Sequence, residues 1–115
     1  LGDKYVELAQ CLSEKGVTMY GAYWCPHCTN QKKAFGEAAF EEIKYVECDA
    51  RGENGNPKLC LEKKIESYPT WEFADGSRAK GEQKPEELAA KVGCPAPEPE
   101  EPADESAESE SNDNE

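Results

Sequence analysis

Two cysteines separated by two residues, Cys25 and Cys28, are the part of this 115-residue chain best suited to chemistry. A thiolate is the nucleophile of disulfide exchange, and the free N–H groups and dipole of a helix N-terminus stabilise it. An apolar segment precedes the pair and helix-forming residues follow it. We therefore expect Cys25 to begin a helix, with Cys28 one turn further on and close enough to form a disulfide with it.

The residues between the cysteines adjust this chemistry. Pro26 suits the first turn of a helix, where its missing N–H group is not needed. A protonated His27 would add positive charge beside the thiolate. Stabilising the reduced form in this way makes the disulfide a stronger oxidant.

The motif Trp24-Cys25-Pro26-His27-Cys28 after an apolar strand resembles the active site of the thioredoxin superfamily, in its DsbA-like Cys-Pro-His-Cys form. A longer set of residues is similar to the thioredoxin-like domain fused to bacterial and plant vitamin K epoxide reductase homologues. The matching segments are Met19 to Cys28, Gln31-Lys32, Phe35-Gly36, Tyr45 to Cys48 and Ser67 to Trp71. The resemblance runs from about Lys15 to Gly93. It implies an α/β thioredoxin fold, with a central mixed sheet flanked by helices.

This resemblance also implies roles for individual residues. Cys25 would be the exposed attacking cysteine and Cys28 the buried resolving cysteine, with Trp24, Pro26 and His27 tuning the site. Tyr68 and Pro69 would shape the substrate groove, because the matching proline of the family is cis and packs against the cysteines. The alternative for Pro69 is a trans proline that opens an edge strand.

One position departs from the thioredoxin pattern. Many thioredoxins carry a buried aspartate six residues before the first active-site cysteine, and this chain has Met19 there. That carboxylate is thought to take the proton of the second cysteine when it attacks. Either water or another group must therefore serve here, or fast reduction of substrates is not the task of this protein.

The other four cysteines favour an oxidising compartment, where disulfides persist and stabilise small domains. The resemblance places a second pair on Cys48 and Cys60, which flank a polar loop; two free buried thiols are the alternative. Such a bridge would stabilise the fold by about 3 kcal/mol. For Cys11 and Cys94 we predict a third bridge, although four cysteines allow three connectivities and Cys11 could also be a buried free thiol.

Composition argues against several other classes of protein. A zinc site would need two closely spaced cysteine pairs or a matching Cys/His set, and eleven residues without histidine separate Cys48 from Cys60. We therefore expect no metal. The formal net charge of −12 comes mostly from residues 96–115, which hold nine acidic and no basic residues, so it says little about the folded part. No basic face stands out and the balance is acidic, so we expect no nucleic acid partner. No stretch approaches the roughly 18 apolar residues of a membrane helix.

The remaining pattern predicts one domain over residues 1–94 and a disordered, acidic tail rich in Pro, Glu and Ser over 95–115. No signal peptide is visible and the chain begins at Leu1, so we interpret it as a mature or excised fragment. We expect helices at 3–15 (with Asp3 as N-cap), 25–40, 58–64 and 85–92, and strands at 17–23, 43–47, 70–73 and 77–80. Gly36 is a predicted break in the second helix, and Asp75-Gly76 predicts a hairpin.

These observations predict a thiol–disulfide oxidoreductase outside the cytoplasm, in a periplasm or thylakoid lumen, that promotes disulfide formation in other proteins. We expect a monomer without a cofactor, acting on protein dithiols and disulfides. The resemblance implies that a quinone-reducing, vitamin K epoxide reductase-like membrane protein accepts the electrons. It also implies that this domain is tethered through a membrane domain absent from this chain. A thioredoxin-like reductase is the first alternative. A non-enzymatic binding module is the second, and it would be expected to lack one active-site cysteine.

Overall fold

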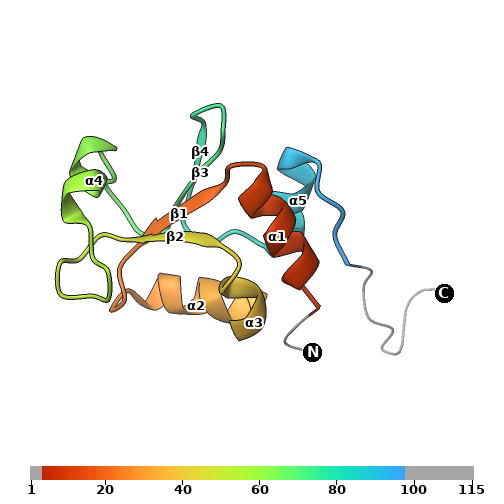
Figure 1. Ribbon diagram of the computed structural model, residues 1–115, viewed down its shortest axis with the longest axis horizontal. Coiled ribbons are helices and arrows are strands. Elements are labelled where there is room, and N and C mark those ends of the chain that lie inside the picture. The colour runs from red at the N-terminus through yellow and green to blue at the C-terminus, as the bar shows by residue number, and fades with distance from the viewer. Residues whose placement is uncertain (1–3, 98–115) are drawn as a thin grey trace.

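Four short strands form a mixed sheet at the centre of the computed structural model, which describes residues 4–97 (Figure 1). They are β1 (Thr18–Gly21), β2 (Lys44–Glu47), β3 (Thr70–Glu72) and β4 (Arg78–Lys80), in the spatial order β2-β1-β3-β4. Strand β1 runs parallel to β2 and antiparallel to β3, and β3 and β4 form the predicted hairpin. The central position of β1 places the turn that follows it in the middle of one sheet edge.

Five helices surround this sheet. They are α1 (Val6–Glu14), α2 (Pro26–Phe35), α3 (Glu37–Phe40), α4 (Pro57–Glu62) and α5 (Pro85–Val92). Helix α1 packs on α3 and α5, and α4 lies at the opposite end of the molecule from α1 and α5 (Figure 1). This arrangement confirms the predicted α/β class, with a mixed central sheet flanked by helices.

Several boundaries differ from the prediction by one to three residues. Helix α1 begins at Val6, three residues later than predicted, and Asp3 lies outside the described residues. Strand β1 ends at Gly21 rather than at Tyr23, because the Ala22 carbonyl accepts the N–H of Cys25 and turns the chain. Tyr23 is consequently exposed instead of buried in the sheet.

The predicted helix 25–40 is two helices. Gly36 has a φ of 93°, a backbone conformation that glycine adopts without steric cost, and it ends α2 before α3 begins. The predicted break at Gly36 is thereby confirmed. Most of the predicted acidic tail, residues 98–115, lies outside the described residues.

The main core lies between the sheet and helices α1, α2 and α5. Trp71 of β3 is fully buried there against Phe35 of α2, with 5.9 Å between the ring centroids. Leu8 and Leu12 of α1 close this core from its other side. Met19 is fully buried in the same cluster, so the position that is acidic in many thioredoxins completes an apolar core here.

Candidate active site

The turn after β1 carries the two cysteines onto the first turn of α2. Cys25 is the N-cap residue, Pro26 is the first helical residue, and Cys28 follows within the same turn. Both thiols are free. Cys28 is 1% exposed and Cys25 is 6% exposed, so Cys25 is more covered than the predicted exposed thiol. The Tyr68 segment covers it, and the Cys25 sulfur lies 3.8 Å from the Tyr68 carbonyl oxygen.

Gly21, the last residue of β1, makes room for the second thiol. A Cβ atom at this position would lie 2.7 Å from the Cys28 sulfur, closer than such contacts allow. The thiol is thus packed against the strand backbone. Burial raises the pKa of Cys28 to about 12, so Cys28 is a neutral thiol near neutral pH.

We expect a thiol alkylating reagent to modify Cys25 near neutral pH while Cys28 reacts at least about a hundredfold more slowly. The reason is that Cys28 is both buried and protonated under these conditions. Peptide mapping by mass spectrometry over a time course of iodoacetamide treatment measures the two rates separately. Equal rates at the two cysteines would contradict the assignment of Cys28 as the buried partner.

Trp24 forms an exposed apolar surface beside Cys25. Its side chain is 52% exposed, and its ring packs edge-on against Tyr68 with 5.9 Å between centroids. The indole Nε1 donates a 2.7 Å hydrogen bond to Asp49, and Asp49 is also paired with Arg51. The hydrogen bonds from Arg51 hold the pKa of the Asp49 carboxyl well below its usual range. The sequence prediction missed Asp49 and Arg51, because both fall in a loop that appeared only polar.

Tyr68, which contacts Trp24, also lies against Cys25, and Pro69 follows it in the chain. The Tyr68–Pro69 peptide bond is cis. Strand β3 begins at the next residue, so the sheet fixes this segment, and the Pro69 carbonyl accepts the N–H of Gly81. The structure therefore brings together all the residues predicted for tuning and for the groove.

His27 has an acidic partner that the sequence did not indicate. Its Nδ1 lies 2.7 Å from a carboxylate oxygen of Glu82, which also accepts a hydrogen bond from Asn30. The His27 and Asn30 hydrogen bonds hold the pKa of the Glu82 carboxyl below its usual range. Any positive charge on His27 is therefore shared with Glu82 and is not directed at Cys25 alone.

A buried amide that the prediction did not single out holds α2 in place. The Gln31 side chain accepts hydrogen bonds from the Trp71 indole at 3.1 Å and from the backbone N–H of Gln83 at 2.7 Å. It also donates to the Gln83 carbonyl at 2.7 Å. All of its polar atoms are thus used, as burial requires. The only signal in the sequence was a polar residue on the inward side of an otherwise apolar helix face.

The remaining four cysteines form two disulfides. Cys48 is bonded to Cys60, which connects the end of β2 to α4, and Cys11 is bonded to Cys94, which connects α1 to the residue after the α5 cap. These are the pairs proposed from the sequence. Cys25 and Cys28 remain as the two thiols available for exchange.

Within residues 4–97, no cluster of three or more His, Cys, Asp or Glu side chains is arranged to hold a metal ion. None of the helices in the same range has the length and apolar character needed to cross a membrane.

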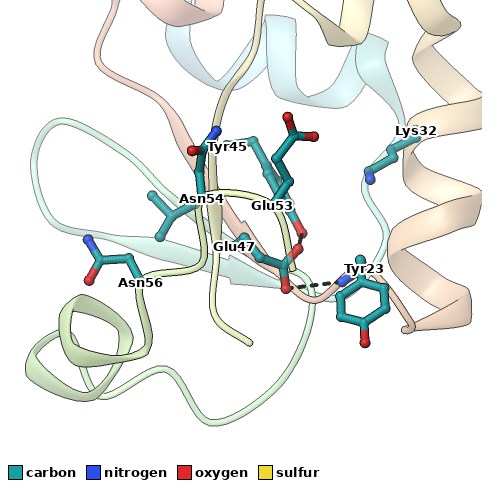
Figure 2. Close-up of a pocket in the computed structure, with 8 residues that line it drawn as sticks. Tyr23, Lys32, Tyr45, Glu47, Glu53, Asn54 and Asn56 are labelled. Carbon is teal, nitrogen blue, oxygen red and sulfur yellow. Dashed lines mark hydrogen bonds between the residues drawn. The ribbon is translucent and has the colours of Figure 1, made fainter. Parts of the chain in front are cut away.

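A buried carboxylate lies beside the cysteine pair, at the end of β2. Glu47 is 5% exposed, and its side chain accepts hydrogen bonds from the backbone N–H groups of Tyr23 at 3.2 Å and Asp49 at 3.1 Å. It also accepts a 2.8 Å hydrogen bond from the Tyr45 hydroxyl. Figure 2 shows this group at the wall of a cavity of about 450 Å³. The sequence prediction did not include Glu47 or Tyr45 in the site.

The sheet order, the helix that begins at Cys25 and the adjacent Pro69 together define a domain of the thioredoxin fold with a Cys-x-x-C site. Comparison with curated proteins shows similarity to the thiol-disulfide oxidoreductase LTO1 of Arabidopsis thaliana, with 41% identity over 91 residues. The match covers 76% of this chain and 24% of that protein, so the chain spans about a quarter of the length of its relative. No family model matches the chain.

Proposed function

We propose that this protein is a thiol–disulfide oxidoreductase that exchanges electrons with protein thiols through Cys25 and Cys28. The observation that carries the proposal is the state of the six cysteines. Four are joined in disulfides, and the two free thiols occupy the first turn of α2 beside the Tyr68 carbonyl. The name of the Arabidopsis relative supports the same reaction class.

The exchange begins with attack on the Cys25–Cys28 disulfide. A substrate thiolate attacks the Cys25 sulfur, the bond to Cys28 breaks, and Cys28 takes up a proton because its buried site disfavours the thiolate. A second substrate thiolate then attacks the sulfur bonded to Cys25. Cys25 leaves as a thiolate, the substrate departs with a new disulfide, and the enzyme retains two electrons as the Cys25 thiolate and the Cys28 thiol.

The surface around Cys25 suits an extended protein segment. Trp24 and Tyr23 are exposed large apolar side chains next to the cysteine, and Tyr68 packs against Trp24. Aromatic side chains provide large contact areas at low entropic cost. Together with the Tyr68 backbone, they form the groove that we assign to a substrate chain.

We further propose that the protein works as an oxidant outside the cytoplasm, in a periplasm or thylakoid lumen, as a monomer without a cofactor. Two closed disulfides in so small a domain support an oxidising compartment. The resemblance to domains fused with vitamin K epoxide reductase homologues supports a membrane quinone reductase of that type as the acceptor of electrons from Cys25 and Cys28.

The reduction potential of the Cys25–Cys28 pair tests this direction. We expect a value of roughly −120 to −200 mV, in the range of disulfide-forming proteins, because the N-terminus of α2 stabilises the Cys25 thiolate. Equilibration with defined glutathione mixtures, read by alkylation and mass spectrometry, measures the potential. The variant His27→Tyr should have a more negative reduction potential and so be less oxidising. A tenfold change in the equilibrium constant for exchange corresponds to about 30 mV.

Two other results would replace this proposal. A potential near −270 mV would identify the protein as a thioredoxin-like reductase. Failure of Cys25 and Cys28 to form a disulfide under any glutathione mixture would favour a binding module that has only kept the fold.

A further inference from the structure

The buried thiol of Cys28 poses a proton-transfer problem that the proposed reaction does not solve. Cys28 is a neutral thiol near neutral pH, yet it must become a thiolate each time it attacks a mixed disulfide on Cys25. The position from which many thioredoxins supply a carboxylate is occupied by Met19. Either water or a different group of this chain must therefore accept the proton.

The tyrosine opposite Met19 in the sheet places a hydroxyl group near Cys28. Tyr45 of β2 is paired with Met19 of β1. A Cβ atom built on Gly21 would lie 2.7 Å from the Cys28 sulfur and 3.4 Å from the Tyr45 hydroxyl. The thiol and the hydroxyl thus both lie against the bare backbone of Gly21.

The Tyr45 hydroxyl is directed at a carboxylate. It donates a 2.8 Å hydrogen bond to one oxygen of Glu47, while the other oxygen accepts the N–H groups of Tyr23 and Asp49. Burial and the neighbouring Glu47 raise the pKa of Tyr45, which keeps its hydroxyl protonated at neutral pH. The hydroxyl can therefore pass on its own proton only as it receives another.

The loop after β2 packs tightly against the Glu47 side chain. The loop crosses it at Gly52, where a Cβ atom would lie 2.6 Å from Glu47 Cγ and 2.7 Å from Cδ. Neutral backbone N–H groups and one hydroxyl supply all its described hydrogen bonds, and no ion pair to Glu47 is found within residues 4–97. A buried carboxylate whose hydrogen bonds all come from neutral groups is costly to keep for packing alone.

The cavity beside Glu47 connects the group to solvent. Tyr45, Glu47 and Tyr23 line its wall, together with Glu53 from the loop and Lys32 from α2 (Figure 2). This cavity gives Glu47 a route for proton exchange with water.

We propose that Tyr45 and Glu47 form the proton relay of Cys28, with Tyr45 at the thiol and Glu47 as the group that holds the proton. The inference rests on the proposed oxidoreductase function and identifies which residues serve it. Tyr45 acts next to the reacting sulfur, and Glu47 acts through Tyr45.

The proposed step resolves a mixed disulfide between Cys25 and a partner protein. The Cys28 sulfur attacks the Cys25 sulfur and forms the intramolecular disulfide. The bond from Cys25 to the partner breaks, and the partner thiolate leaves. The Cys28 proton passes to the Tyr45 oxygen while the Tyr45 proton passes to Glu47. In the reverse direction Glu47 returns the proton to the departing Cys28 thiolate.

Several charged or titratable groups face this relay and contribute to its pH response. Glu53 and Lys32 line the same cavity, and the Lys32 ammonium lies 5.1 Å from the centre of the Tyr45 ring. Asp49 donates its backbone N–H to Glu47, and its carboxylate accepts the N–H of the Trp24 indole. The neighbouring ionisable groups from other elements are Tyr23, Cys25, Cys28 and Tyr68.

The test separates the two thiol steps in one reaction. Reduced protein with both structural disulfides intact is mixed with 5,5′-dithiobis(2-nitrobenzoate). Attack by Cys25 releases the first thionitrobenzoate, and attack by Cys28 on the resulting mixed disulfide releases the second. Stopped-flow absorbance follows both releases as a function of pH.

We expect Tyr45→Phe and Glu47→Gln to slow the second release by roughly a hundredfold near neutral pH, the size of a lost proton-transfer group. The first release should keep its rate. The loss should shrink as pH rises, because hydroxide then accepts the Cys28 proton. The double variant should be no slower than the slower single variant, since the two groups act in series.

Tyr20→Phe is the matched control. Tyr20 is a buried tyrosine of β1 whose hydroxyl also donates to a carboxylate, that of Glu72, and it belongs to the separate cluster around Cys48 and Cys60. This variant should leave both releases unchanged. An unchanged second release in the Tyr45 and Glu47 variants, or a loss of equal size at every pH, would overturn the relay. A wild-type protein that releases only one thionitrobenzoate would instead overturn the proposed oxidoreductase function.

Discussion

Replacing Cys25 by serine should abolish thiol–disulfide exchange, whereas replacing Cys28 by serine should trap the substrate. Cys25 is the thiol at the α2 N-cap beside the Tyr68 carbonyl, so its loss removes the nucleophile. Without Cys28, a mixed disulfide on Cys25 has no neighbouring thiol to resolve it. Oxidation of a dithiol peptide should fall by at least about a thousandfold in Cys25→Ser.

Non-reducing gels and mass spectrometry distinguish the two variants. The Cys28→Ser protein should accumulate a covalent adduct with the peptide that dithiothreitol removes, and Cys25→Ser should form none. Thr29→Ser is a suitable control, because the hydroxyl that donates to the Cys25 carbonyl is retained. An adduct that forms equally well on Cys28 in the Cys25→Ser protein would show that the two roles are reversed.

Removing the disulfide between Cys11 and Cys94 should cause the largest loss of stability. The bridge joins residues 83 positions apart, and in the chain-entropy model the closure of so long a loop contributes about 4.5 kcal/mol. This is a large part of the 5–15 kcal/mol typical of a domain. The double variant Cys11→Ala/Cys94→Ala should therefore unfold at a much lower urea concentration than the wild type.

The second disulfide provides the matched comparison. Cys48 and Cys60 are 12 positions apart, so Cys48→Ala/Cys60→Ala should lose only about 3 kcal/mol. Urea titrations followed by far-ultraviolet circular dichroism give both values under the same conditions. A smaller loss for the long bridge than for the short one would contradict an origin in the unfolded chain, and strain or altered packing would have to be considered instead.

Local patterns were sufficient to predict most helices and strands and the position of the cysteine pair, whereas the thioredoxin fold was implied by the family resemblance. The Cys-Pro step after an apolar run indicates a strand that ends at a helix start, and Asp75-Gly76 indicates a hairpin. Both features are in the structure. Boundaries were less accurate, because they depend on single hydrogen bonds such as the one from Cys25 to Ala22.

The polar surroundings of the cysteines could not be predicted in the same way. The contacts from Trp24 to Asp49 and from His27 to Glu82 join residues 25 and 55 positions apart. Glu47 comes beside the site because the parallel pairing of β1 and β2 sets it opposite Gly21. A shift of one residue in this pairing would turn its side chain to the other face of the sheet, and nothing local in the sequence fixes that register.

The two tryptophans give the protein two separate optical reporters. Trp24 is exposed beside Cys25, whereas Trp71 is fully buried between Phe35 and Gln31. Oxidation or reduction of the cysteine pair should change the fluorescence of Trp24 and leave that of Trp71 nearly constant, while unfolding should shift the emission of Trp71 to longer wavelength. With Trp24→Phe and Trp71→Phe as single-reporter proteins, redox state and unfolding can be followed independently without an added dye.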